Sequence, residues 1–415
     1  MAEPAAPQHG GRALRRAPLA VALALVLAAL AWLLAAHALW QSSVPAGLRL
    51  PHVAAGSLFD AHYLASSRSY ELLLDIVGVL AELAVLAVLW IYARRGAVLM
   101  RESAAGPLGT GMLLGMLGFA FVWLVEVPFR LVAVWWERRH GVSHAGYVET
   151  VLSSFLALGG TFVFVSFALL VAMGLARITR RWWWLLAAPV FAALALLSVY
   201  VSPYLVPNTH ALKDPVTKGE VAALARRERV PGTSAEVQDV RRFTTAPNAE
   251  SVGFGPTRRV ILWDTLLDGR FDRSEVRVVI AHELGHITHG HLLKRVAWLM
   301  LFLLPATALV ALATARRGGL GRPEAVPLAL LVFVALQLVA APLMNVVSRR
   351  DEAEADWSAL RATDDPQSAR TLFVNLARTS HADPDPPAWS YVLFATHPSI
   401  VQRVAMADAW QQGAR

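Results

Sequence analysis

Long apolar runs separated by short polar segments dominate this chain. Seven of the runs are long enough to cross about 30 Å of hydrocarbon as helices. We predict transmembrane helices at approximately 18–40, 72–93, 107–128, 151–176, 183–206, 296–315 and 325–346. The first run has an alternative interpretation as a signal peptide, because arginines precede it and small residues follow. It exceeds the usual length of a signal peptide's apolar region, so we interpret it as a retained anchor.

Two long polar segments interrupt this pattern, one between the fifth and sixth runs and one after the seventh. An even number of crossings separates them, so both lie on the same side of the membrane and can build one site together. The chain therefore divides into four parts. These are 1–206 with five transmembrane helices, 207–295 as a folded insert, 296–346 with two more transmembrane helices, and 347–415 as a second folded part.

The insert has recognisable local signals. Its segment 214–227 predicts a helix, and short strands are predicted at 237–240, 250–253 and 259–263 around Gly and Pro turns. A second helix is predicted to begin near Asp272, where Asp272 and Glu275 have the spacing of a capping box.

Composition supports a membrane protein and limits the chemistry. Hydrophobic residues make up 56% and charged residues 16%, against about 25% charged in soluble domains. Cysteine is absent, which excludes disulfides, a thiolate metal site and a cysteine nucleophile, so any metal must be held by His, Asp or Glu. The net charge of +8 comes from arginines beside the apolar runs. This placement favours a membrane interface over a nucleic-acid surface, and we expect no nucleic-acid partner.

Acidic residues within the apolar runs allow another class of function. Asp75 and Glu82 are seven residues apart and share a helix face, and Glu126 lies near Arg130 at the end of the third run. A carboxylate facing lipid is costly, so these groups should face a protein interior or a wet cavity. In a transporter such acids would line the path of the substrate. The alternative is a structural role in which they pair with residues of a neighbouring helix.

The strongest chemical signal is the segment His282-Glu283-Leu284-Gly285-His286. On a helix His282 and His286 project from one face, where both imidazoles can reach one zinc ion. Glu283 lies beside them and can take a proton from a water that zinc activates. The alternative is a pair of surface histidines on an amphipathic helix.

A third ligand decides between classes of zinc site. The position of a third metzincin histidine holds Leu292, which excludes that class. No acid lies between Glu283 and Glu324. After the seventh run Glu352 and Asp356 share a helix face, so we assign Glu352 as the third ligand and Asp356 as a carboxylate that orients a ligating imidazole. The alternative is a solvated helix end.

Three further groups near these motifs have weaker assignments. His289 lies near the metal-binding face of the same helix, and His291 should point away from it. Glu354 should point roughly opposite to Glu352. His289 could therefore touch the site, and for both histidines we expect mainly structural roles or support of the metal ligands.

With these motifs in place, the chain resembles the integral-membrane CAAX prenyl endopeptidases, the Ste-type zinc metalloproteases related to HtpX. The similarity covers roughly 107–408. The resembling segments are 127–141, 202–205, 248–253, 259–266, 282–291, 348–356 and 397–403.

The resemblance implies an all-α multi-pass membrane protein of about seven transmembrane helices. They would enclose a large chamber capped by a small α+β zincin-like (gluzincin) metalloprotease domain that binds one zinc ion per chain. Substrate would add as a strand beside Asn248 and Ala249. His397 and Arg403 would stand near the zinc and steady the substrate or the oxyanion. From the residues alone, these two are equally a loop histidine and a helix-surface arginine.

The resemblance also implies an activity, namely zinc-dependent hydrolysis of membrane-associated or lipidated peptides and proteins in the bilayer. An HtpX-like protease for membrane-protein quality control is the first alternative. A transporter or a sensor with a degenerate zinc site is the alternative from another class. Ala353 and Glu250 replace aromatic residues of the eukaryotic members, so the preference of the substrate pocket should differ.

Flanking charges and family resemblance disagree on the side of the cell membrane that the polar segments face. Arginines of four short flanking regions favour an extracytoplasmic catalytic domain by the positive-inside rule. The resemblance implies a cytoplasmic one, and the loop after the third run, with Arg130, Arg138 and Arg139, also opposes the charge argument. The four groups are Arg12, Arg15, Arg16; Arg94, Arg95, Arg101; Arg177, Arg180, Arg181; and Arg316, Arg317, Arg322.

Overall fold

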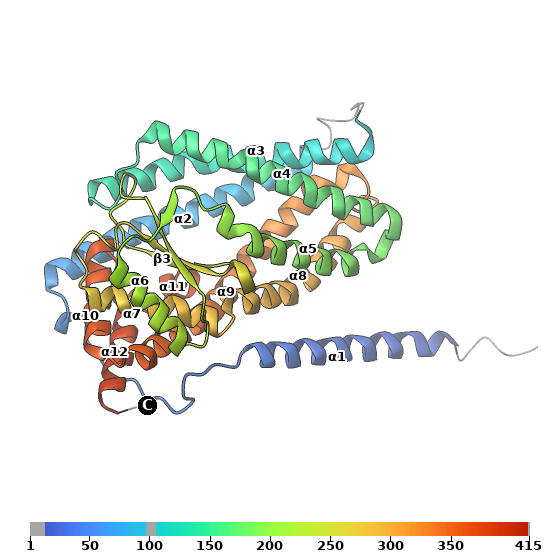
Figure 1. Ribbon diagram of the computed structural model, residues 1–415. Helices are drawn as coiled ribbons and strands as arrows, with labels where there is room; N and C mark the ends of the chain where they lie inside the picture. Colours follow the sequence, from blue (N-terminus) through green and yellow to red (C-terminus); the bar gives the residue numbers. More distant parts are fainter. Residues whose placement is uncertain (1–12, 97–104, 414–415) are drawn as a thin grey trace, which may run out of the picture. The chain divides into compact units, whose positions relative to one another are not determined.

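The computed structural model describes residues 13–96 and 105–413, which fall into two units, Met1–Gln41 and Ser42–Arg415. The first unit contains one apolar helix, α1 (Ala13–Leu39). The second unit contains every other element (Figure 1). Of the arginines used in the charge argument, Arg12 and Arg101 lie outside the described residues.

Six long helices form the membrane part of the second unit. They pack around a common apolar core that includes Leu89, Leu114 and Met173. On the opposite faces large apolar side chains are exposed, among them Leu124 and Leu312, as expected of helix faces in lipid. The helices are α2 (Ala61–Arg95), α3 (Gly106–Arg139), α4 (Tyr147–Thr179), α5 (Trp183–Val201), α8 (His291–Ala315) and α9 (Val326–Thr363).

Each of the seven predicted transmembrane segments overlaps one long helix. Within the described residues, six candidate spans are long and apolar enough to cross a membrane, and one of them, Tyr147–Tyr204, contains both α4 and α5. A short 3₁₀ turn, Arg180–Trp182, separates these two helices. The structure is therefore that of a multi-pass membrane protein, as predicted.

Glycines let α3 pack closely on its neighbours. Gly111, Gly115 and Gly118 are spaced at one helix face. A Cβ at Gly115 would clash with Leu169 Cδ1 of α4, and one at Gly118 would lie 2.6 Å from Leu330 Cδ1 of α9. Small residues at such positions allow membrane helices to approach without a hydrophobic driving force.

A four-stranded sheet lies in the first polar segment, with strand order β1-β2-β4-β3. The β1/β2 and β3/β4 pairs are antiparallel and the β2/β4 pair is parallel. The strand predicted at 259–263 is found at those residues, β2 begins before its predicted start, and β1 was not predicted. The strands are β1 (Thr209–Ala211), β2 (Ser234–Gln238), β3 (Ala249–Val252) and β4 (Arg259–Trp263). Because β3 pairs only with β4, it is an edge strand.

Helices from both polar segments complete a second apolar core with one face of this sheet. That core joins Val260 and Leu262 of β4, Ile280 and Leu284 of α7, and Trp357 of α9. The remaining elements are α6 (Pro215–Arg227), α7 (Arg273–Thr288), α10 (Pro366–Ser380), α11 (Ala388–Leu393) and α12 (Ile400–Gln411), with 3₁₀ turns at Ala55–Ser57, Ser202–Tyr204, Gly255–Thr257 and Pro323–Ala325.

Helix α9 belongs to both parts of the second unit. Its 38 residues make it about 57 Å long at 1.5 Å per residue, more than a bilayer core requires. Its beginning packs in the membrane core through Val326 and Leu330, and its end packs in the second core through Trp357 and Leu360. A single continuous helix thus connects the membrane part to the folded polar part.

Two of the acidic residues in the apolar runs line a cavity. Glu82 of α2 and Glu126 of α3 face a space of about 350 Å³ that α9 closes with Gln337. Glu126 also lies 3.6 Å from Arg130 in an ion pair along α3. Both carboxylates therefore face a cavity between helices, as their cost in lipid requires.

The arginine-rich turns gather at one end of the membrane part. The α4–α5 and α8–α9 turns are neighbours, since Arg177 Cγ lies 3.1 Å from the place of a Cβ on Gly321. Helix α3 contacts the 3₁₀ turn before α9, and a Cβ at Gly111, near the start of α3, would lie 3.4 Å from Val326 Cγ2 at the start of α9. Tyr92 near the end of α2 donates to the Leu114 carbonyl of α3. Helix α9 begins at this end and finishes in the second core. The turns therefore lie at the end of α9 away from the sheet.

Candidate functional site

Helix α7 begins with the predicted capping box. The Asp272 backbone N–H donates to Glu275 Oε2 at 2.8 Å, which is the contact that the side chain of the third helical residue makes in a capping box. Glu275 Oε1 also accepts from Asn375 Nδ2 of α10 at 2.8 Å. Residues 280–286 are buried all round, so local capping and tertiary packing fix the helix that carries the His-Glu motif.

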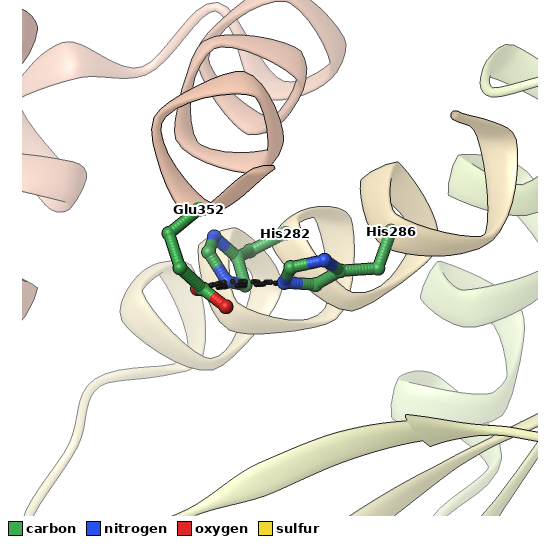
Figure 2. Close-up of side chains that lie close together, drawn as sticks. All are labelled: His282, His286 and Glu352. Carbon is green, nitrogen blue, oxygen red and sulfur yellow. Dashed lines mark hydrogen bonds and ion pairs between the residues drawn. The ribbon is translucent and has the colours of Figure 1, made fainter. Parts of the chain in front are cut away.

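Two imidazoles of α7 and one carboxylate of α9 converge (Figure 2). His282 Nε2 lies 3.1 Å from His286 Nε2 and 3.1 Å from Glu352 Oε2. His286 Nε2 lies 3.5 Å from the same carboxylate oxygen. Ligands at 2.0–2.1 Å around a tetrahedral zinc are separated by roughly 3.3 Å. The donor set and its spacing therefore fit one metal ion.

The opposite nitrogen of His282 is held by a carboxylate. His282 Nδ1 lies 2.9 Å from Asp356 Oδ1, and Arg403 of α12 binds Asp356 through Nε at 2.8 Å and Nη2 at 2.7 Å. Donation from Nδ1 to Asp356 would leave Nε2 as the lone-pair donor that a metal needs. Asp356 is 2% exposed, so a buried carboxylate fixes the orientation of the His282 ring.

The electrostatic environment of His282 favours a cation. Burial alone would lower the pKa of its ring, but the hydrogen bonds to Asp356 and Glu352 raise it to about 10. The site thus attracts positive charge strongly even within the protein interior. A metal ion at Nε2 would take the place of that proton.

The nitrogen of His286 that faces away from the candidate metal site contacts a third histidine, which corrects a prediction. His291 was expected to point away, but its Nδ1 lies 2.8 Å from His286 Nδ1. Helix α7 ends at Thr288, and Gly290 has a φ of +63° before α8 begins. His282 and His291 thus lie on two different helices, and the direction of His291 cannot be derived from its spacing of nine residues along α7. His291 Nε2 lies 3.1 Å from Glu354 Oε2, which supports its orientation.

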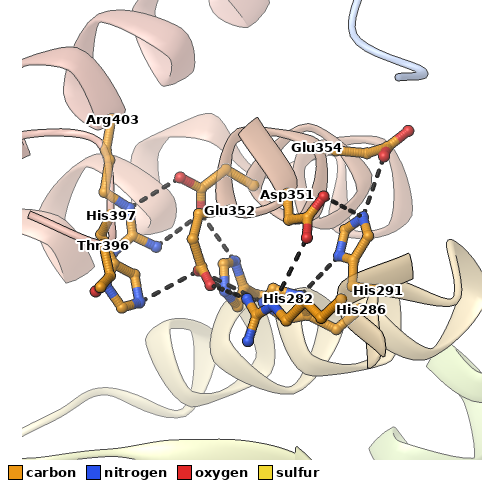
Figure 3. A network of polar contacts seen from close by, with 11 residues as sticks. His282, His286, His291, Asp351, Glu352, Glu354, Thr396, His397 and Arg403 are labelled. Carbon is orange, nitrogen blue, oxygen red and sulfur yellow. Dashed lines mark hydrogen bonds and ion pairs between the residues drawn. The ribbon is translucent and has the colours of Figure 1, made fainter. Parts of the chain in front are cut away.

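Figure 3 shows the wider polar network around the three candidate ligands. Arg295 Nη2 of α8 donates to Glu352 Oε1 at 3.2 Å, so it binds the carboxylate oxygen that does not face the histidines. His397 Nε2 lies 3.2 Å from Glu352 Oε2, the oxygen that faces His282 and His286. His289 instead contacts Ser358 Oγ at 3.2 Å and Glu354.

A cavity of about 620 Å³ opens over the candidate ligands. Glu283 lines it with only 6% of its surface exposed. His397 and Arg403 line it too, together with residues of α5, β3, α8 and α10. The predicted catalytic, ligand and substrate-binding residues therefore border one space, although their roles remain predictions.

Strand β3 forms one wall of this cavity. Five consecutive residues, Asn248 to Val252, line it. Side chains of a strand alternate between faces, so a wall made of consecutive residues is the edge of the strand. The predicted substrate-binding residues Asn248 and Ala249 lie on this edge.

Sequence reasoning did not predict roles for Arg295 or Glu250. Arg295 follows Lys294 in a basic pair beside an apolar run, which is typical of membrane boundaries, so nothing in the sequence distinguished it. In the sequence Glu250 differs from the aromatic residue of the eukaryotic members, but this difference alone predicts no role. In the structure it lines the cavity, and burial together with the nearby charge of Glu283 raises the pKa of its carboxyl group.

Comparisons with known proteins agree with this geometry. Residues 211–411 match the model described as peptidase family M48. The chain is 29% identical over 245 residues to an uncharacterized metalloprotease YhfN of Bacillus subtilis, covering 56% of this chain and 57% of that protein. It is 27% identical to a protease HtpX homolog of Methylibium petroleiphilum, covering 39% and 63%. The chain thus spans about three fifths of the length of these two relatives.

Two longer matches extend into the membrane part. A CAAX prenyl protease 1 homolog of Oryza sativa subsp. japonica is 24% identical over 340 residues, covering 77% of this chain and 79% of that one. The crystal structure of Ste24p from S. mikatae superposes with a TM-score of 0.74 at 15% identity, covering 91% and 96%. The predicted resemblance and the predicted fold class are confirmed.

Proposed function

Taking this chain as a relative of the M48 membrane metalloproteases, we propose that it hydrolyses peptide bonds with one zinc ion held by His282, His286 and Glu352. The observation that carries the proposal is the convergence of these three donors. They lie beside Glu283, in a cavity that has a strand edge as one wall. Two histidines and a glutamate form a known donor set for catalytic zinc, with one position left open.

Glu283 is the proposed general base. When bound, zinc would supply Lewis acidity that makes a water molecule acidic and polarises the peptide carbonyl. Glu283 would accept the proton of that water and return it to the leaving amine. Its carboxylate has no hydrogen bond or ion pair within the described residues, so it is available to water and substrate.

The surrounding residues have different proposed roles. Arg403 gives both Nε and Nη2 to Asp356, so we assign it to positioning Asp356 and, through it, His282. Arg295 would position Glu352 by binding its other oxygen. His397 is half-exposed and reaches the same site, which suits a donor to the carbonyl oxygen as negative charge develops there.

Substrate would bind as an extra strand on β3. The Asn248 carbonyl accepts from the Trp263 N–H of β4 at 3.0 Å. In an antiparallel pair, successive residues alternate between bonding the neighbouring strand and facing away from it. The backbone groups of Ala249 and Ser251 therefore face the free edge, where an extended peptide can pair with them.

The proposed substrates are membrane-associated peptides or proteins. The cavity lies where the catalytic core meets α5 and α8 of the membrane part, so a chain leaving the bilayer can reach it. Lipidated peptides are the first class to test, given the CAAX prenyl protease homolog. Damaged membrane proteins are the second, given the HtpX homologs.

The test is hydrolysis by the purified full-length chain in detergent. We expect cleavage of a quenched fluorescent peptide library that is lost when a chelator removes the metal and restored by added zinc. Prenylated and unprenylated copies of the peptides that are cleaved then compare the two substrate classes. Cleavage that persists in chain verified to be metal-free would contradict the proposed chemistry.

We further propose that the catalytic domain faces outside the cytoplasm. Three turns rich in arginine lie at the end of the membrane part away from the sheet. By the positive-inside rule, that end should face the cytoplasm. The described arginines of these turns are Arg94, Arg95, Arg177, Arg180, Arg181, Arg316, Arg317 and Arg322. The opposite end of α3, with Arg130, Arg138 and Arg139, carries fewer.

A single cysteine tests this orientation, because the natural chain has none. Ser234 is exposed at the start of β2. In intact cells, Ser234→Cys is expected to react with a membrane-impermeant maleimide. Arg317→Cys, in the α8–α9 turn, should react only after lysis. The reverse pattern would place the catalytic domain in the cytoplasm.

A further inference from the structure

Glu250 is acidic and is the middle residue of the strand edge, Asn248 to Val252, that faces the cavity. Four carboxylates line this cavity, namely Glu250, Glu283, Glu352 and Asp356. Glu352 and Asp356 belong to the candidate metal site, and Glu283 is the proposed base. Glu250 has no role in the proposed reaction.

The two arginines that line the cavity are already paired with other carboxylates. Arg295 pairs with Glu352 and Asp351, and Arg403 pairs with Asp356. Within the described part of the chain, the Glu250 side chain has neither an ion pair nor a hydrogen bond. A half-buried carboxylate without a partner is costly, so this position is suited to a cation supplied from outside.

The strand geometry indicates where such a cation would come from. Glu250 lies between Ala249 and Ser251, whose backbone groups face the free edge of β3. When a strand adds to this edge, the residue opposite Glu250 shares its face, with Cβ atoms about 4.5–5.5 Å apart. Glu250 would therefore meet one particular side chain of the substrate.

That side chain should lie close to the bond that is cut. Glu250 and Glu283 line the same cavity, and burial, followed by the charge of Glu283, raises the pKa of the Glu250 carboxyl group. A cation beside Glu250 would relieve both its burial without a partner and its repulsion from Glu283. An anionic side chain at the same place would add to the repulsion.

We propose that Glu250 is a specificity-determining residue that selects a lysine or arginine side chain of the substrate near the scissile bond. This inference rests on the proposed peptidase function and on strand addition at β3. A charge-assisted contact of this kind favours a basic over a neutral substrate by roughly tenfold to a hundredfold.

The experiment compares peptides with the metal-loaded full-length chain. A peptide that the chain cleaves is varied at each position within three residues of the cut, with lysine, glutamine or glutamate in turn. For the wild type we expect kcat/KM at one position to be at least tenfold higher with lysine than with glutamine, and lowest with glutamate.

Variants assign this preference to Glu250. Glu250→Gln should bring the ratio of kcat/KM for the lysine and glutamine peptides to about one without changing the metal content, and Glu250→Lys should favour the glutamate peptide. Glu236→Gln is the matched control, since Glu236 lies in the same sheet, pairs with Arg259 at 2.7 Å and does not line the cavity. It should keep the wild-type preference.

Two results would overturn the inference. One is a wild type that cleaves peptides without preferring lysine at any position, and the other is an unchanged preference in Glu250→Gln. If the metal-loaded wild type cleaves no peptide at all, the proposed function itself fails. The two failures are therefore distinguishable.

Discussion

Replacing Glu283 with glutamine is expected to lower kcat for peptide hydrolysis by about 10²- to 10⁴-fold, the range for loss of a general base. Glutamine has nearly the same shape but cannot accept the proton of water. Glu283 is not among the three convergent donors, so the variant should bind zinc as the wild type does. Steady-state hydrolysis and metal content, measured on the same preparations, give both results.

A matched control separates this effect from purification losses. Glu149 is exposed in the first turn of α4 and does not line the cavity, so Glu149→Gln should keep the wild-type rate. Full activity in Glu283→Gln would show that another group accepts the proton. Loss of zinc together with activity would show that Glu283 holds the metal instead.

Replacing Glu352 with alanine is expected to weaken zinc binding by more than about a hundredfold, beyond the range for residues that only support a ligand. The substitution removes one of three donors. It also leaves Arg295 Nη2 and His397 Nε2 without the carboxylate that each now approaches. Among the described residues, Arg295 would then have only Asp351 as an ion-pair partner, so its charge beside the two imidazoles would be less well compensated and would oppose cation binding. Competition with a chelator of known zinc affinity measures the change.

The control for this variant is Glu324→Ala. Glu324 is exposed in the 3₁₀ turn that precedes α9, far along that helix from Glu352. It should bind zinc like the wild type. Unchanged zinc affinity in Glu352→Ala would mean that another acid, such as Asp356, is the third ligand.

Local patterns allowed the sequence to predict the elements that carry the site. The strand at 259–263 and the cap at Asp272 depend on neighbouring residues only. The convergence of Glu352 on the two histidines was predicted because few acids are available after α7. The position of β1 was not predicted, since its three residues are too few to show an alternating pattern.

Contacts between elements were much harder to predict. The predicted direction of His291 was wrong because the chain turns at Gly290, between α7 and α8. Arg295 reaches Glu352 only because α8 packs beside α9. Strand β3 lies at the edge of the sheet because β4, which follows it in the sequence, pairs with β2 in parallel. The edge that faces the cavity therefore depends on this strand order. None of these features has a signature in residue spacing.

The metal content of the purified wild-type chain tests the central claim most directly. Elemental analysis of the full-length protein in detergent is expected to find one zinc per chain, without added metal or after zinc is supplied and the excess removed. A well-folded wild type that retains no metal after zinc has been supplied would contradict the account.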